Sequence, residues 1–139
     1  MGRLTKNPEI KYAGKDNDMA LTEEQKKKTA WERARKIEGY DAAMFRQDAC
    51  GAWIIWDQYG NRENSYGWEI DHILPISKGG RDIADNLRAL QHQNNASKGD
   101  DYPSYTAVVV ADGTRNIRSV RNLTVNKQVR ERLRQFENF

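Results

Sequence analysis

Hydrophobic and polar positions divide the chain into short segments, and the first periodic one covers residues 21–39. Its apolar residues recur at helical spacing and are Ala30, Trp31, Ala34 and Ile37. Thr22, with Gln25 three positions later, predicts a capping box at the start of a helix, and Gly39 predicts its end. Residues 1–20 are polar and have no period, so we expect a flexible N-terminal arm there.

The middle of the chain alternates between apolar runs and turn residues. A second short helix is predicted over 41–49, strands over 53–56, 68–74 and 87–90, and a further helix over 91–100, which Gly99 ends. Residues 59–61 predict a turn, and 76–86 a loop with two adjacent glycines. Three of the four tryptophans fall between residues 53 and 68, where we expect them to pack the sheet.

The last third predicts one more strand and a closing helix. The strand covers 106–110, a turn covers 111–116, and the helix covers 122–136. The apolar face of this helix would consist of Val125, Val129, Leu133 and Phe136. No repeat or linker divides the chain, so we expect one domain of the α+β class over residues 21–139.

Composition narrows the class of protein. Charged residues make up 31% of the chain and the mean hydropathy is −0.96. No apolar run is long enough to cross a bilayer, and the N-terminus lacks the apolar stretch of a secretory signal, so we expect a cytoplasmic protein with no membrane partner. Cys50 is the one cysteine, which excludes a disulfide framework or a cysteine-rich zinc site.

Charge is weaker as an indicator. The net charge is +3 and the pI about 9.0, which is too mild to predict nucleic-acid binding alone. Basic residues cluster over 26–28, 33–36 and 115–134. Taken alone, such clusters favour solvated helix faces over phosphate-binding surfaces.

Polar side chains with catalytic potential lie at the edges of the predicted central elements. Asp71 and His72 fall near the end of the strand over 68–74, and Asn95 falls on the following helix. A carboxylate and an amide carbonyl suit a hard cation such as Mg²⁺, and histidine suits a general base near neutral pH. Adjacent strand residues point to opposite faces, so Asp71 and His72 can share a ligand only where the strand twists or ends.

Three strings in this region, DHILPISKGG (71–80), NLRAL (86–90) and NASK (95–98), resemble the HNH endonuclease motif on the ββα-metal, or His-Me finger, fold. The resemblance covers residues 69–100, with flanking helices at both ends of the chain. It implies hydrolysis of DNA phosphodiester bonds to 5′-phosphate and 3′-hydroxyl ends, with one Mg²⁺ or Mn²⁺ ion. The partner it implies is DNA, and a homodimer would be one route to a double-strand break.

The resemblance also implies a role for each matched residue. His72 would be the general base that activates water, and Asp71 and Asn95 would bind the metal. Asn86 would hold the loop and help to orient the base, and a backbone carbonyl of the loop is the expected partner of the second ring nitrogen of His72. Lys98 would be a phosphate contact or a structural partner.

Several neighbouring residues remain alternatives or additions. His92 and Asn94 compete with Asn95 for the metal, although an exposed helix histidine is the simpler interpretation of His92. Lys78 and Arg81 in the loop could bind phosphate or remain solvated. Arg130 and Arg134 on the closing helix are expected to contact DNA phosphates.

The chain departs from a pattern common in the family. Many relatives hold a structural zinc with paired Cys-x-x-Cys motifs, but here Gln91 and Asn94 occupy the later positions and only Cys50 remains upstream. We therefore expect no structural zinc, and expect the tryptophans to stabilise the fold instead. A non-cleaving nucleic-acid-binding module on the same scaffold is the alternative function. The competent residues at positions 71, 72 and 95 favour the enzyme.

Overall fold

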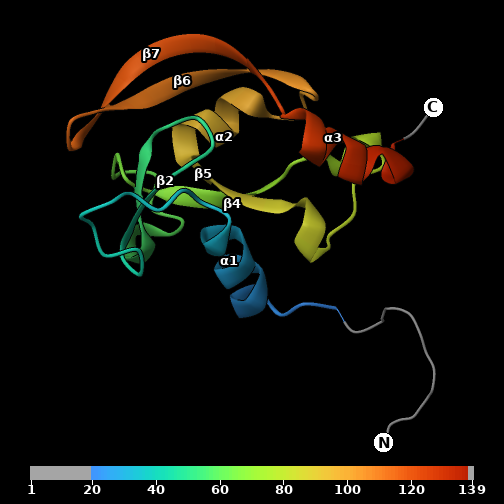
Figure 1. Cartoon of the computed structure of the whole chain (residues 1–139), viewed down its shortest axis with the longest axis horizontal. Helices are drawn as coiled ribbons and strands as arrows, with labels where there is room; N and C mark the ends of the chain where they lie inside the picture. Colours follow the sequence, from blue (N-terminus) through green and yellow to red (C-terminus); the bar gives the residue numbers. More distant parts are fainter. Residues whose placement is uncertain (1–19, 138–139) are drawn as a thin grey trace, which may run out of the picture.

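Short helices and three two-stranded antiparallel sheets make up residues 20–137, the part of the chain that the computed structural model describes (Figure 1). This confirms the α+β class. The predicted arm over residues 1–20 lies almost entirely outside the described residues. None of the helices between residues 20 and 137 is long and apolar enough to cross a membrane.

Helix α1 covers Glu23–Glu32 and begins with the predicted capping box between Thr22 and Gln25. It ends seven residues before the predicted stop at Gly39, because a side chain from a later segment binds its last carbonyl groups. The Arg46 guanidinium donates to the carbonyl oxygens of Trp31, Glu32 and Ala34 at 3.3, 3.2 and 3.3 Å.

The helix predicted over 41–49 is wrong. Strand β2 (Phe45–Gln47) lies there instead and pairs with β3 (Trp53–Ile55). Asp41 starts a turn by accepting a hydrogen bond from the Ala43 amide at 2.9 Å. The pairing partner of β2 lies further along the chain, so the local helix propensity of this segment is overridden by tertiary contacts.

The central elements match the prediction. Strand β4 (Trp68–His72) pairs with β5 (Leu87–Gln91) from Trp68↔Gln91 to His72↔Leu87, and helix α2 (His92–Lys98) follows directly. The Gln91 side chain accepts hydrogen bonds from the first amides of α2, and Gly99 ends it with φ +51°. Strand β4 ends two residues earlier than predicted, at His72.

The C-terminal part contains a strand that the sequence did not predict. Strand β6 (Ser104–Asp112) pairs with β7 (Arg115–Thr124), and helix α3 covers only Lys127–Leu133 rather than 122–136. A bulge near Ala107 and Val109 breaks the two-residue alternation that identifies a strand. The hairpin arches over α2, which separates it from β4 (Figure 1).

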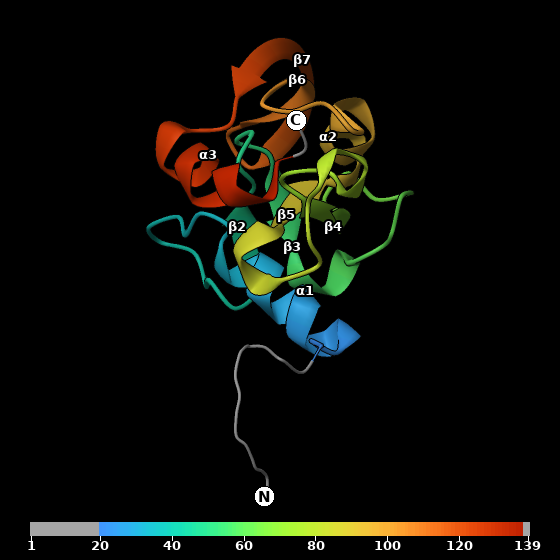
Figure 2. The ribbon, with the colours of Figure 1, turned by 90° about the vertical axis from the view of Figure 1, so that its right-hand side faces the viewer.

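Two apolar clusters lie on opposite sides of the β4–β5 sheet. Figure 2 shows α1 on one side and the β6–β7 hairpin with α3 on the other. On the α1 side, the fully buried Trp68 packs against Trp31 and Trp56, with ring centroids 5.3 and 5.8 Å apart. The other cluster contains Ile73, Leu74, Leu90, Tyr105, Ala107, Val125 and Leu133. The sheet that carries Asp71 and His72 is thus fixed from both faces.

Candidate functional site

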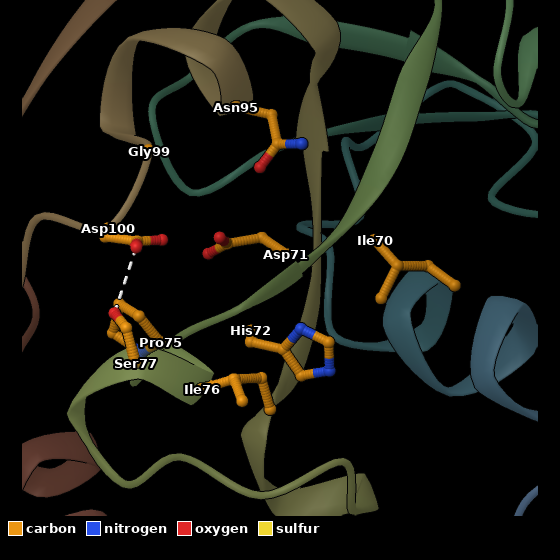
Figure 3. Close-up of a pocket in the computed structure, with 9 residues that line it drawn as sticks. All are labelled: Ile70, Asp71, His72, Pro75, Ile76, Ser77, Asn95, Gly99 and Asp100. Atoms are coloured by element: carbon orange, nitrogen blue, oxygen red, sulfur yellow. Dashed lines mark hydrogen bonds between the residues drawn. The ribbon is translucent and has the colours of Figure 1, made fainter.

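The predicted site residues meet at the end of β4, where this strand has a free edge. Gly60 donates to the Trp68 carbonyl oxygen at 2.8 Å, and beyond that point β4 pairs only with β5 among residues 20–137. Asp71, His72 and Asn95 line one pocket there (Figure 3). Since the pocket opens at the strand edge and end, side chains from both faces of β4 reach it.

Asp71 is held by two cations. It is 5% exposed, its Oδ2 accepts from Arg88 Nε at 2.9 Å, and its Oδ1 lies 3.2 Å from Lys98 Nζ. Lys98 is 1% exposed and also donates to the His72 carbonyl oxygen at 3.2 Å. Burial lowers the pKa of Lys98. Of the two roles expected for Lys98, the structural partner fits; a DNA-phosphate contact does not, because the ammonium is enclosed.

His72 has a partner that the sequence did not predict. Its Nε2 lies 3.0 Å from Oδ1 of Asp82, a residue of the glycine loop, whereas we expected a backbone carbonyl. The other oxygen of Asp82, Oδ2, accepts from Lys26 Nζ of α1 at 2.5 Å. The hydrogen bond from Lys26 lowers the pKa of Asp82. The imidazole is therefore linked through one carboxylate to a helix that lies far upstream in the chain.

Asn95 is oriented by Glu69, a second residue that sequence reasoning missed. The Asn95 Nδ2 donates to Glu69 Oε1 at 2.9 Å, and Glu69 is bound in turn by Arg62. Burial alone would raise the pKa of Glu69, but the hydrogen bonds from Arg62 and Asn95 lower it. With the amide nitrogen engaged by Glu69, the carbonyl oxygen of Asn95 lies toward Asp71 (Figure 3).

Asn86 shapes the loop and does not reach the pocket. It is fully buried; its Oδ1 accepts from the Leu74 amide at 2.8 Å, and its Nδ2 donates to the carbonyl oxygens of Leu74 and Arg81, both at 2.9 Å. A side chain at Gly80 would place its Cβ 1.7 Å from the Leu74 carbonyl oxygen. These contacts fit the loop-holding role expected of Asn86, and its role in catalysis remains a prediction.

Neither competitor for the metal lies in the pocket. Asn94 is fully buried, where its side chain bonds to Asp48 and to the backbone of Val108 and Val109. His92 Nε2 lies 3.1 Å from the Asn64 carbonyl oxygen, which ties the start of α2 to the preceding loop. Asn95 is thus the residue of α2 that presents an amide oxygen to the pocket.

A buried carboxylate connects the turn after β2 to the end of β5 and to α2. Asp48 is fully buried and accepts from the amides of Cys50, Ala52 and Gln91 at 2.9, 2.8 and 2.9 Å, and from Asn94 Nδ2 at 3.2 Å. Burial raises the pKa of Asp48, and these four donors act against that shift. The tryptophans are therefore not the whole source of stability that we expected; a polar hub also joins these segments.

The basic candidates lie outside the pocket lining. Lys78 and Arg81 are exposed on the loop, and the Arg81 guanidinium lies 5.4 Å from the ring centroid of Phe136. Arg134 is exposed, whereas Arg130 is half-buried and donates to the Val125 carbonyl oxygen at 2.9 Å. Their contact with DNA remains a prediction.

The pocket offers a divalent cation two oxygen donors, the Asp71 carboxylate and the Asn95 amide, and Asp100 also lines it. Among residues 20–137, no three His, Cys, Asp or Glu side chains gather into a fuller metal site. Two protein ligands suit Mg²⁺, which retains several waters and binds substrate oxygens. The donor set therefore fits the ion that the resemblance implies.

Comparison with known proteins identifies the same segment. Residues 59–104 match the family model described as HNH endonuclease. Neither a curated protein nor a solved structure matches the chain significantly. The matched segment contains β4, β5 and α2 and the residues that converge on the pocket. Residues 59–104 of this chain are therefore similar to the HNH endonuclease family.

Proposed function

We propose that the protein is a metal-dependent endonuclease that hydrolyses DNA phosphodiester bonds, leaving 5′-phosphate and 3′-hydroxyl ends. The observation that carries this proposal is the convergence of Asp71, His72 and Asn95 on one pocket, each with its own supporting partner. In this proposal β4, β5 and α2 are the ββα-metal core, and residues 21–139 form one domain around it.

Asp71 and Asn95 would hold one Mg²⁺ or Mn²⁺ ion. When bound, such an ion supplies Lewis-acid polarisation of the phosphate and neutralises developing negative charge. Arg88 and Lys98 orient the Asp71 carboxylate, and Glu69 turns the Asn95 carbonyl toward it. These three neighbours fix the ligands before a substrate arrives, which limits the reorganisation needed at the moment of reaction.

His72 acts as the general base. Its side chain is 33% exposed and lines the pocket beside Asp71, so water that enters the pocket can reach the imidazole. The ring removes the proton from the attacking water. Lys98 holds the His72 backbone at the strand end by donating to its carbonyl oxygen. General-base catalysis by one side chain contributes roughly 10²–10⁴-fold to a rate.

A plasmid-nicking assay with Mg²⁺ or Mn²⁺, with and without a chelator, tests the proposal. Cleavage should require the metal, and His72→Ala should reduce its rate by about 10²-fold or more. His92→Ala is the matched control, because this second histidine lies outside the pocket, and it should cleave like the wild type. End-group mapping of the products should find 5′-phosphates.

Equal activity of the wild type and His72→Ala with every metal would contradict the endonuclease mechanism. Binding of DNA without metal-dependent nicking would instead support the alternative of a non-cleaving module on an HNH scaffold. Fluorescence anisotropy on the same DNA separates these results.

A further inference from the structure

We propose that Asp82 is a positioning residue for His72, which keeps a proton on Nε2 and leaves Nδ1 as the ring atom that accepts a proton from water. This inference rests on the proposed function, since it specifies how the general base of that site is prepared. It assigns a role to Asp82 and to Lys26, neither of which belongs to the motif strings.

The contact itself dictates the direction of the hydrogen bond. Asp82 Oδ1 lies 3.0 Å from His72 Nε2, and Asp82 Oδ2 accepts from Lys26. An ionised carboxylate can only accept, so the shared hydrogen must belong to the imidazole. The hydrogen bond from Lys26 lowers the pKa of Asp82 and so favours this ionised form. A neutral ring with its proton on Nε2 has its lone pair on Nδ1.

The free nitrogen lies toward the pocket. In the view of Figure 3, Nδ1 lies on the side of the ring toward Asp71 and Asn95, and Nε2 points away from them. A second cavity adjoins the first; Lys26, Glu69 and Asp82 line it, and it shares Ile70, His72 and Asn95 with the first. The two nitrogens therefore face different surroundings, one the proposed metal ligands and the other the loop carboxylate.

The fold holds Asp82 from two directions. The loop before it passes close to the Leu74 backbone at Gly80, and the loop after it is fixed by Asn86. From the opposite side, α1 supplies Lys26, whose side chain is 17% exposed while that of Asp82 is 45% exposed. Without Lys26, a carboxylate this exposed would be free to turn into solvent. Helix α1 thus braces the base of a site 46 residues later in the chain, at His72.

Asp85 provides a matched control on the same loop. It also pairs with the C-terminal end of α1, through the cap residue Arg33 at 3.5 Å, but among residues 20–137 its side chain has no hydrogen bond or ion pair with His72. Asp85→Ala removes one loop carboxylate and one ion pair with the α1 segment, as Asp82→Ala does, but it leaves the hydrogen bond to the His72 imidazole in place. Comparison of the two variants separates positioning of His72 from general loosening of the loop.

Two measurements on the full chain test the inference. In ¹H–¹⁵N NMR of the imidazole groups at a pH where the rings are neutral, the wild type should show a downfield Nε2 proton for His72. This signal should be lost in Asp82→Ala and kept in Asp85→Ala, with His92 as the internal reference. In the nicking assay, Asp82→Ala should lower kcat by about 10- to 100-fold with little change in KM for DNA, and Asp85→Ala should stay near the wild type.

Wild-type kcat in Asp82→Ala, or an Nε2 proton signal that does not depend on Asp82, would overturn the inference. Equal loss of kcat in both variants would also overturn it, because the effect would then belong to the loop. If the wild type shows an Asp82-dependent signal but never cleaves DNA, the hydrogen bond is supported and the proposed function is the part that fails.

Discussion

Glu69 and Asp71 lie two residues apart on β4, and both side chains face α2. On that helix Asn95 and Lys98 lie three residues apart, so the two-residue repeat of a strand is matched to a turn of the helix. Glu69 binds Asn95, and Asp71 binds Lys98. This pairing decides which end of the Asn95 amide faces the pocket, and with it whether an oxygen or a nitrogen is presented to a cation.

Removing the acceptor at position 69 should therefore weaken metal binding. In Glu69→Leu the Asn95 amide loses its partner and can turn, and we expect the affinity for Mn²⁺ to fall about 10- to 100-fold. Glu69→Gln retains an oxygen that can accept from Asn95 and should stay close to the wild type. Isothermal titration calorimetry of both variants checks this, and equal Mn²⁺ affinity in Glu69→Leu would show that Asn95 needs no such support.

At this scale the sequence identifies the residues that converge on the pocket but not those that hold them. The short motifs over residues 71–80 and 95–98 contain Asp71, His72 and Asn95, and these motifs can be identified from the sequence alone. Their partners follow no such pattern, because Lys26 lies 56 positions from Asp82 and Glu69 lies 26 positions from Asn95. Contacts at such separations depend on the folded arrangement of α1, β4 and α2.

At the scale of elements, the Asp48 hub joins the β2–β3 hairpin to the end of β5 and to α2. Asn94 extends the connection to β6, where its Oδ1 accepts from the amides of Val108 and Val109 at 2.8 and 2.9 Å. Three pieces of the chain are thus tied by hydrogen bonds from two buried side chains. Each donor in this hub would be costly to leave without an acceptor.

Asp48→Asn should destabilise the fold by about 3 kcal/mol, because the new amide group would place N–H donors against the N–H donors already there. Urea denaturation measures the free energy of unfolding. Asp57→Asn is the control, since this carboxylate is exposed, and it should change stability by less than about 0.5 kcal/mol. If Asp48→Asn unfolds at the same urea concentration as the wild type, the hydrogen bonds around Asp48 do not stabilise the fold.

The elements that the sequence predicted well are those with local signals. The capping box identifies the start of α1, and Gly99 identifies the end of α2. Strands β2 and β7 were missed for different reasons. Strand β2 is three residues long and acquires its conformation from β3, and β7 has its apolar residues Ile117, Val120 and Leu123 at three-residue spacing beside a bulge. Neither the short length of β2 nor the three-residue apolar spacing of β7 identifies a strand from the local sequence.

At the scale of the whole molecule, the basic residues near the C-terminus are the proposed DNA-binding surface. Arg130→Glu with Arg134→Glu should weaken DNA binding at low salt, and should reduce the slope of log affinity against log salt by up to about 2. Fluorescence anisotropy measures both. Mn²⁺ affinity and the thermal midpoint should remain unchanged, which controls for the bond from Arg130 to Val125. Unchanged DNA affinity would exclude α3 from the interface.

One pocket in each chain would cut one strand of a duplex. The homodimer expected from the sequence therefore stays a prediction, and two successive nicks by a monomer are the alternative. The oligomeric state in solution, measured with and without DNA, distinguishes a homodimer that would cut both strands from a monomer that would nick one strand at a time.

The hydrogen bonds around Asp48 also determine whether the segment that matches the family model could keep its structure outside this chain. The family match spans residues 59–104, yet Asp48, Lys26 and Val109 all lie outside it. Excised at those limits, the segment would lose the acceptor for Gln91, the three residues that bind the Asn94 side chain and the lysine that holds Asp82. A graft of this motif into another scaffold would transfer the reacting residues without their orientation. The segment that retains these hydrogen bonds runs from α1 to β6, and the matched motif is only its interior.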